Sequence, residues 1–171
     1  ETGRDFLTES DSGHVDLPRA RRGNVAAMLS AVFIRDAYLP GQALARTLRA
    51  VDRLLEMIAA SGGRMQLVTN VAELERCLRD GTFGAILHFE GAEAIDPEFA
   101  VLRLGYRLGL RSLGLTWSRP NIYAEGVGPD DRGRGLTNLG RALVRACNEL
   151  GVLIDVSHLN DAGFWDVIEC S

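Results

Sequence analysis

Apolar runs that alternate with amphipathic segments restrict the fold of this sequence more than any other feature. Four runs have the length and character of strands: Val25–Ile34, Phe83–Glu90, Arg111–Thr116 and Gly151–Val156. The first two are apolar almost throughout, which predicts strands buried on both faces, as in parallel sheets covered by helices. Strands and helices that alternate along a chain predict a parallel α/β fold.

The segments between these runs have the periodicity of helices. Along Gln42–Ala60, apolar residues recur at steps of three and four and predict one stripe that faces a core. The stripe consists of Leu44, Leu48, Val51, Leu55 and Ile58. Asp96 and Thr137 have side chains suited to capping two of the later helices. These helices are expected over Val71–Asp80, from Pro97 to about Leu108, from Thr137 to Leu150 and over Asp161–Cys170.

Two polar residues at the C-terminal ends of predicted strands favour a barrel. Glu90 closes the second strand, and His158 follows the fourth. Functional residues at the C-terminal ends of several strands are typical of the TIM barrel. Eight strands need roughly 250 residues, however, and this chain has 171. The pattern therefore leaves two alternatives, a small open sheet or an incomplete barrel.

Composition and charge exclude some classes of partner. The net charge of -4 gives no bulk attraction to nucleic acid or to anionic membranes. No apolar run reaches the roughly 18 residues that suggest a membrane span. The opening residues lack both an initiator Met and the apolar core of a signal peptide. The cysteines, which are odd in number and widely spaced, do not suggest a disulfide framework. We therefore expect a cytoplasmic protein whose true N-terminus lies upstream of Glu1.

Glu90 and His158 are the candidate metal ligands. A carboxylate at the end of a buried strand is costly unless it is paired, hydrogen-bonded or bound to a metal, and imidazole is a common zinc ligand. Each residue also has an ordinary interpretation. Glu90 can form an ion pair with one of the many arginines, and His158 can be incidental to a loop in which Ser157 or Asn160 caps the next helix.

The other two histidines are weaker candidates. His88 shares a strand face with Glu90, but a histidine in such a position is more often a satisfied interior residue. His14 and Asp16 have the spacing of a two-ligand metal clamp, yet the polar residues before them do not form the buried strand that would aim both side chains at one ion. We expect a short helical turn after Pro18 and predict that His14 and Asp16 are not ligands.

Four segments resemble the membrane dipeptidase family, and their order and spacing agree with that family over roughly Asp16 to Ser171. The last of them is close to the signature around the fifth strand of the family. The segments are His88-Phe-Glu-Gly-Ala-Glu-Ala-Ile95, Leu108-Gly-Leu-Arg-Ser-Leu-Gly-Leu-Thr116, Gly135-Leu-Thr-Asn-Leu-Gly-Arg-Ala-Leu-Val-Arg145 and Asn148-Glu-Leu-Gly-Val-Leu-Ile-Asp-Val-Ser-His158.

The resemblance implies a (β/α)8 TIM barrel to which residues 1–171, as a single incomplete domain, contribute roughly strands two to five. It implies two zinc ions, with Glu90 bridging both and His158 binding one. A hydroxide held between the ions would attack the carbonyl of a small dipeptide, because the metals generate the nucleophile and polarise the carbonyl. A D-residue at the C-terminal position of the dipeptide and a homodimeric assembly are both compatible with the resemblance.

The chain departs from the family pattern in three places. The His-x-Asp clamp of the first strand has no counterpart, because Asp16–Gly23 resembles the segment that leads into the second strand. A further zinc histidine, a late catalytic Asp and a substrate-binding Arg would lie after Ser171. Where the mammalian enzymes have a His that contacts substrate, Thr116 is followed by a segment that resembles a bacterial branch. This likeness assigns Trp117 and Asn121 to the substrate pocket.

We therefore predict a zinc-dependent metallo-dipeptidase, a hydrolase of bacterial type, and expect the 171-residue segment to be inactive by itself. Two alternatives stay open. Another binuclear hydrolase of amidohydrolase type, such as a lactonase, would carry a carboxylated Lys in place of Glu90, and this chain has no Lys. A relative without metals that binds a partner or peptide is the non-enzymatic alternative, which Trp117 in place of His suggests.

Overall fold

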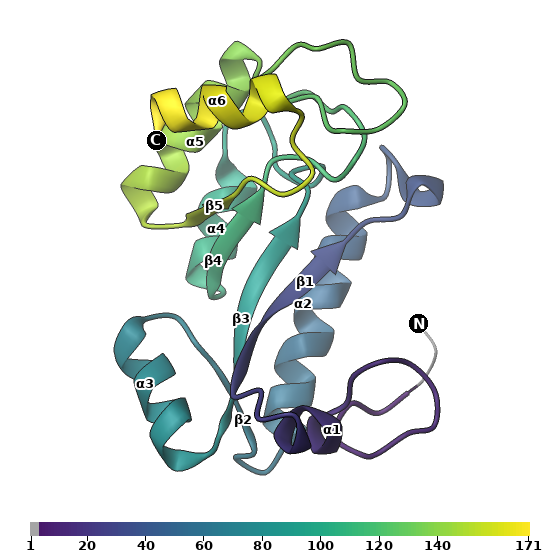
Figure 1. Cartoon of the computed structure of the whole chain (residues 1–171), viewed down its shortest axis with the longest axis vertical. Helices are drawn as coiled ribbons and strands as arrows, with labels where there is room; N and C mark the ends of the chain where they lie inside the picture. The colour runs from purple at the N-terminus through teal and green to yellow at the C-terminus, as the bar shows by residue number, and fades with distance from the viewer. Residues whose placement is uncertain (1–3) are drawn as a thin grey trace.

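The computed structural model describes residues 4–171, in which helices and parallel strands alternate along the chain (Figure 1). Residues 1–3 lie outside the described part of the chain. No helix among residues 4–171 has the length and apolar character that a bilayer crossing requires. The strands are β1 (Ala27–Phe33), β2 (Met65–Leu67), β3 (Phe83–Glu90), β4 (Leu110–Gly114) and β5 (Leu153–Asp155). The helices are α1 (Leu17–Arg22), the 3-10 turn η1 (Asp36–Tyr38), α2 (Ala43–Ala60), α3 (Val71–Asp80), α4 (Ala100–Arg107), α5 (Asn138–Leu150) and α6 (Asp161–Cys170).

One sheet contains all five strands, and every strand pair in it is parallel. Its order is β1-β3-β4-β5, while β2 pairs with the first residues of β3. The registers align Phe33, Glu90, Gly114 and Asp155 in one row across the ends of β1, β3, β4 and β5. The carboxyl ends of the strands therefore meet at one edge, where the sequence predicts the site.

The core lies between the helices and one face of this sheet. Val32, Phe89 and Leu113 point into it, because alternate residues of a strand face the same side. They belong to one cluster with Val51, Leu102, Leu143 and Cys147 from α2, α4 and α5. The other face carries side chains that are 44%, 36% and 60% exposed, those of Leu29, Phe33 and Leu153. A helix-covered face and an open apolar face suit part of a barrel.

Local sequence signals fix most helix ends. Asn70 accepts a hydrogen bond from the Glu73 amide at 2.9 Å and caps α3, and Gly81 ends that helix with a left-handed φ of 70°. Thr137 caps α5 through the amide of Gly140. The predicted bounds of α3 and α6 are confirmed. They could be predicted because capping residues and terminal glycines act on their near neighbours in the sequence.

One burial prediction is wrong and another holds only in part. β1 is not buried on both faces, because the face that carries Leu29 and Phe33 is left exposed within residues 4–171. In α2, Val51 is buried and Leu55 and Ile58 pack against the core clusters, as the predicted stripe requires. Leu44 and Leu48, however, are 44% and 49% exposed. The helix instead buries Ala43 and Thr47 beside Val51. Its core-facing side is therefore rotated from the stripe of large apolar residues.

The predicted start of α4 is also wrong, since the helix begins at Ala100 and not at Pro97. A turn closes from the Phe99 amide to the Asp96 carbonyl, and Phe99 adopts a left-handed φ of 58°, which interrupts helical geometry. The Asp96 carboxylate still accepts hydrogen bonds from the amides of Ala100 and Val101, at 3.0 and 2.7 Å. Asp96 therefore still satisfies amides in the first turn of α4, although residues 97–99 separate it from the helix.

Candidate metal site at the strand ends

Glu90 and His158 meet at the C-terminal edge of the sheet. Glu90 is the last residue of β3, and His158 lies three residues beyond β5. The Nε2 atom of His158 lies 3.2 Å from Oε1 of Glu90, and both side chains are partly exposed. The ordinary interpretation of Glu90, an ion pair with an arginine, is not what residues 4–171 show.

The donor atoms of this pair suit zinc. Carboxylate oxygen and imidazole nitrogen are both zinc ligands, and two atoms bound to one tetrahedral ion are roughly 3.4 Å apart. The observed 3.2 Å between Glu90 and His158 agrees with that spacing. Residues 4–171 contain no group of three or more His, Cys, Asp or Glu residues arranged to hold a metal. They therefore supply two donors and not a complete site.

The backbone of His158 is held in an uncommon conformation. Its φ of 67° is left-handed, which is unusual for a residue other than glycine. The His158 carbonyl accepts hydrogen bonds from the Val127 amide at 3.0 Å and from the Thr116 hydroxyl at 3.4 Å. Asn160 caps α6 by accepting from the Gly163 amide at 2.8 Å. The loop therefore caps a helix and also fixes the backbone of His158.

The imidazole of His158 is oriented by the loop that follows β4. Its Nδ1 lies 3.1 Å from Oγ of Ser118, and its ring centre lies 5.8 Å from that of Trp117. When Nδ1–H donates to Ser118, Nε2 is free to bind a metal, and such partners commonly fix ligand histidines. Sequence reasoning missed Ser118, because the contact spans 40 residues of chain and no motif marks it.

His88 is an interior residue with its own partners. Its Nδ1 lies 2.9 Å from Oγ of Ser112, and its Nε2 lies 3.5 Å from Oδ2 of Asp155. Burial lowers the pKa of His88, so the neutral ring is favoured. Burial acts to raise the pKa of Asp155, but hydrogen bonds from Ser157 outweigh it and the pKa lies below its usual value. Sequence reasoning missed Ser112 and Asp155, which strand register brings beside His88.

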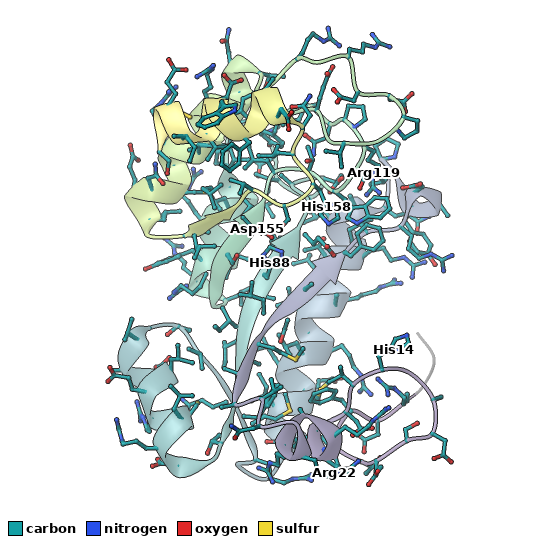
Figure 2. All side chains as sticks on the ribbon, viewed as in Figure 1. His14, Arg22, His88, Arg119, Asp155 and His158 are labelled. Carbon is teal, nitrogen blue, oxygen red and sulfur yellow. The ribbon has the colours of Figure 1, made fainter. Side chains whose placement is uncertain are left out.

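His14 and Asp16 belong to a different part of the molecule. Figure 2 shows His14 on the loop that precedes α1, well apart from His158 at the strand ends. The Asp16 carboxylate caps α1, where it accepts hydrogen bonds from the Arg19 amide at 2.8 Å and from Arg19 Nε at 2.7 Å. It also accepts from the Ser10 amide at 3.2 Å. The carboxylate is therefore committed to local structure.

Trp117 and Asn121 have different surroundings. The Trp117 ring lies between Phe33, at 4.9 Å between centres, and His158. Asn121 uses its amide within the loop, since Nδ2 donates to the Leu115 carbonyl at 2.7 Å and Oδ1 accepts from the Tyr123 amide at 2.8 Å. Trp117 is thus a wall of the site, and Asn121 shapes the loop. Substrate contact by either residue stays a prediction.

A carboxylate and an imidazole at the carboxyl ends of parallel strands are typical of α/β-barrel enzymes with a site at the barrel mouth. Comparison with known families assigns the chain within that class. The family description "Membrane dipeptidase (Peptidase family M19)" matches residues 3–171. The chain belongs to the membrane dipeptidase family.

Similar proteins share this fold and are longer than the chain. A metallopeptidase from Rhodobacter sphaeroides, solved with a phosphinate mimic of the dipeptide L-Ala-D-Ala, has a TM-score of 0.89 and 36% identity, over 95% of this chain and 54% of that one. Dipeptidase AC, a metallopeptidase of family M19, has a TM-score of 0.88 and 39% identity, over 94% and 52%. An uncharacterized protein of the pqqA 5′ region of Klebsiella pneumoniae is 37% identical over 133 residues, 75% of this chain and 49% of that protein. The chain thus spans about half the length of these relatives. The predicted family and the partial-barrel fold class are confirmed.

Proposed function

We propose that the protein containing this chain is a zinc-dependent dipeptidase whose metal site includes Glu90 and His158. The observation that carries the proposal is the 3.2 Å approach of their side chains at the mouth of the sheet, in a chain of a dipeptidase family. Two oxygens on Glu90 can serve two cations, which suits a carboxylate that bridges a pair of ions.

The residues of this chain would bind and orient, while the metal would supply the reactivity. When bound, zinc polarises a carbonyl group and makes water a nucleophile at neutral pH. Ser118 holds Nδ1 of His158 and leaves Nε2 for the metal. Phe33 and Trp117 form an apolar wall beside His158, against which a side chain of the dipeptide can pack.

The substrate we propose is a small dipeptide, including dipeptides with a D-residue at the C-terminal position. Support comes from the Rhodobacter sphaeroides metallopeptidase, whose structure contains a phosphinate mimic of L-Ala-D-Ala. That protein shares 36% of its residues with this chain over the aligned region. L-Ala-D-Ala and L-Ala-L-Ala are therefore the first dipeptides to compare.

Ligand variants of the complete gene product test the proposal. Glu90→Gln and His158→Asn each remove one donor while keeping side-chain size similar. We expect zinc affinity to fall by more than the roughly 100-fold that loss of an outer partner can cause, and dipeptide hydrolysis to be lost. The measurements are the zinc content, by elemental mass spectrometry, and the rate of hydrolysis of both dipeptides.

His14→Asn is the matched control, because it changes a histidine that lies well apart from His158 (Figure 2). Zinc content and hydrolysis should equal those of the wild type. A wild-type protein that binds no zinc, or a Glu90→Gln variant that keeps full zinc content, would overturn the proposal. The first result would favour a relative without metals.

A further inference from the structure

Arg119 joins the exits of three neighbouring strands. Its Nη2 donates to the Ile34 carbonyl just beyond β1 at 2.6 Å, and its Nη1 donates to Asp36 at 2.6 Å. Nη2 also lies 3.2 Å from Oε1 of Glu93, which follows β3. Arg119 itself lies in the loop after β4, and its side chain is only 17% exposed. One guanidinium thus connects the ends of β1, β3 and β4.

The contact between Arg119 and Glu93 is largely buried. Its side chain is 7% exposed, and neither carboxylate oxygen accepts a hydrogen bond within residues 4–171. The contact with Arg119 is therefore an ion pair without hydrogen-bond geometry. Burial raises the pKa of Glu93, while the side chains of Arg119 and Asn121 act in the opposite direction. Loss of Arg119 would leave this buried carboxyl group without the guanidinium that lies 3.2 Å from it.

The residues before Arg119 are those that contact His158. Ser118 lies at Nδ1 of His158, and the Trp117 ring lies beside the imidazole. The Arg119 guanidinium lies 5.5 Å from the ring centres of both Trp117 and Phe33. Figure 2 shows Arg119 and His158 near each other at the same end of the sheet. Arg119 therefore anchors the same loop segment that carries Trp117 and Ser118.

We propose that Arg119, held by Glu93 and the end of β1, is a positioning residue that fixes Ser118 and Trp117 against His158. It acts through Ser118 on the orientation of a metal ligand and through Trp117 on the wall of the site. Its effect on metal binding rests on the proposed function, whereas its effect on the place of Trp117 does not.

The test uses the complete gene product with Arg119→Met, Ser118→Ala and the double variant. Outer partners of ligand histidines are worth 10-fold to 100-fold in metal affinity, so each single variant should weaken zinc binding by about tenfold. Because Arg119 acts through Ser118, the double variant should be within about twofold of Arg119→Met alone. Competition with a chromophoric chelator measures the affinity.

A metal-free readout separates this inference from the proposed function. With 5-fluorotryptophan incorporated and its signals assigned by Trp117→Phe, the fluorine resonance of Trp117 should shift or broaden in Arg119→Met. Arg119→Lys retains the charge beside Glu93, so it should give a smaller change of the same kind. If Arg119→Met does not fold, Arg119→Lys takes its place. Arg141→Met is the control, because Arg141 also joins two carboxylates, Asp166 and Glu169, but between α5 and α6.

Two results would overturn the inference. One is a Trp117 resonance in Arg119→Met and Arg119→Lys that matches the wild type or the Arg141→Met control. The other is a double variant whose loss of zinc affinity is the product of the single losses, which would mean that Arg119 does not act through Ser118. A wild type without zinc would contradict only the proposed function, and the fluorine spectra would still decide the role of Arg119.

Discussion

At the scale of the residue, Asp16 stabilises the start of α1 through three hydrogen bonds to one carboxylate. Burial acts to raise the pKa of Asp16, but the bonds from Arg19 and Ser10 outweigh it and hold the pKa below its usual value. A carboxylate with a lowered pKa stabilises the fold above its unfolded pKa of roughly 3.9. That contribution is lost as the pH falls through the folded pKa.

We expect Asp16→Asn to lower the melting temperature at pH 7 without changing zinc content. The difference from the wild type should begin to shrink below about pH 4, where the carboxyl of the unfolded chain becomes protonated, and should vanish only as the pH falls through the lowered pKa of the folded protein. Thermal unfolding between pH 3 and pH 7 measures this, with Asp11→Asn as a control at an exposed position. A zinc content that falls with Asp16→Asn would instead make Asp16 part of the metal site.

The sequence marks Glu90 and His158 as candidate ligands because each stands at or just beyond the end of an apolar strand, and the structure brings their side chains within 3.2 Å of each other. Sequence reasoning did not find Ser118, Arg119 or Asp155, since their roles depend on contacts across tens of residues that no spacing encodes. The chemistry of a ligand can be predicted from its type and place on a strand. Its supporting partners depend on how the loops pack, which only the folded structure shows.

At the scale of the element, the loop between β4 and α5 depends on a glycine at position 126. A Cβ there would lie 2.4 Å from the Trp117 carbonyl oxygen and 2.9 Å from that of His158. Both neighbours are backbone atoms, so they cannot move aside as a flexible side chain could. The adjacent Val127 amide donates to the His158 carbonyl. Gly126 therefore lets the loop pass between the Trp117 and His158 segments.

Gly126→Ala should force these segments apart. Overpacking commonly costs about 1–3 kcal/mol, and we expect a loss of that size together with weaker zinc binding, because His158 moves. Chemical unfolding and chelator competition on the complete gene product are the measurements. Gly41→Ala is the control, since a Cβ at Gly41 meets nothing within 4 Å. Equal stability and equal zinc affinity in the two variants would contradict this account of the loop.

At the scale of the whole molecule, the parallel α/β order could be predicted because strand and helix periods alternate in the sequence. The burial of each strand could not, since it depends on what lies against it in space. β1 has the composition of a fully buried strand, yet Leu29 and Phe33 are exposed at an edge of the sheet. β5 is the other end strand of the order, and its Leu153 is exposed as well.

The two outer strands, β1 and β5, predict how residues 1–171 behave when expressed alone. Within residues 4–171 the outer edges of β1 and β5 have no partner strand, and an unpaired apolar edge promotes association between chains. We expect the segment to form soluble aggregates, to unfold without a sharp transition and to show no dipeptidase activity, because two donors do not make a metal site. Light scattering and calorimetry measure this, with the complete gene product compared under the same conditions.

Leu29→Lys with Leu153→Lys should reduce the aggregation of the segment, since both changes place charge on the open apolar face. A monomeric segment that unfolds cooperatively and hydrolyses dipeptides with zinc would contradict both the edge argument and the assignment of an incomplete site.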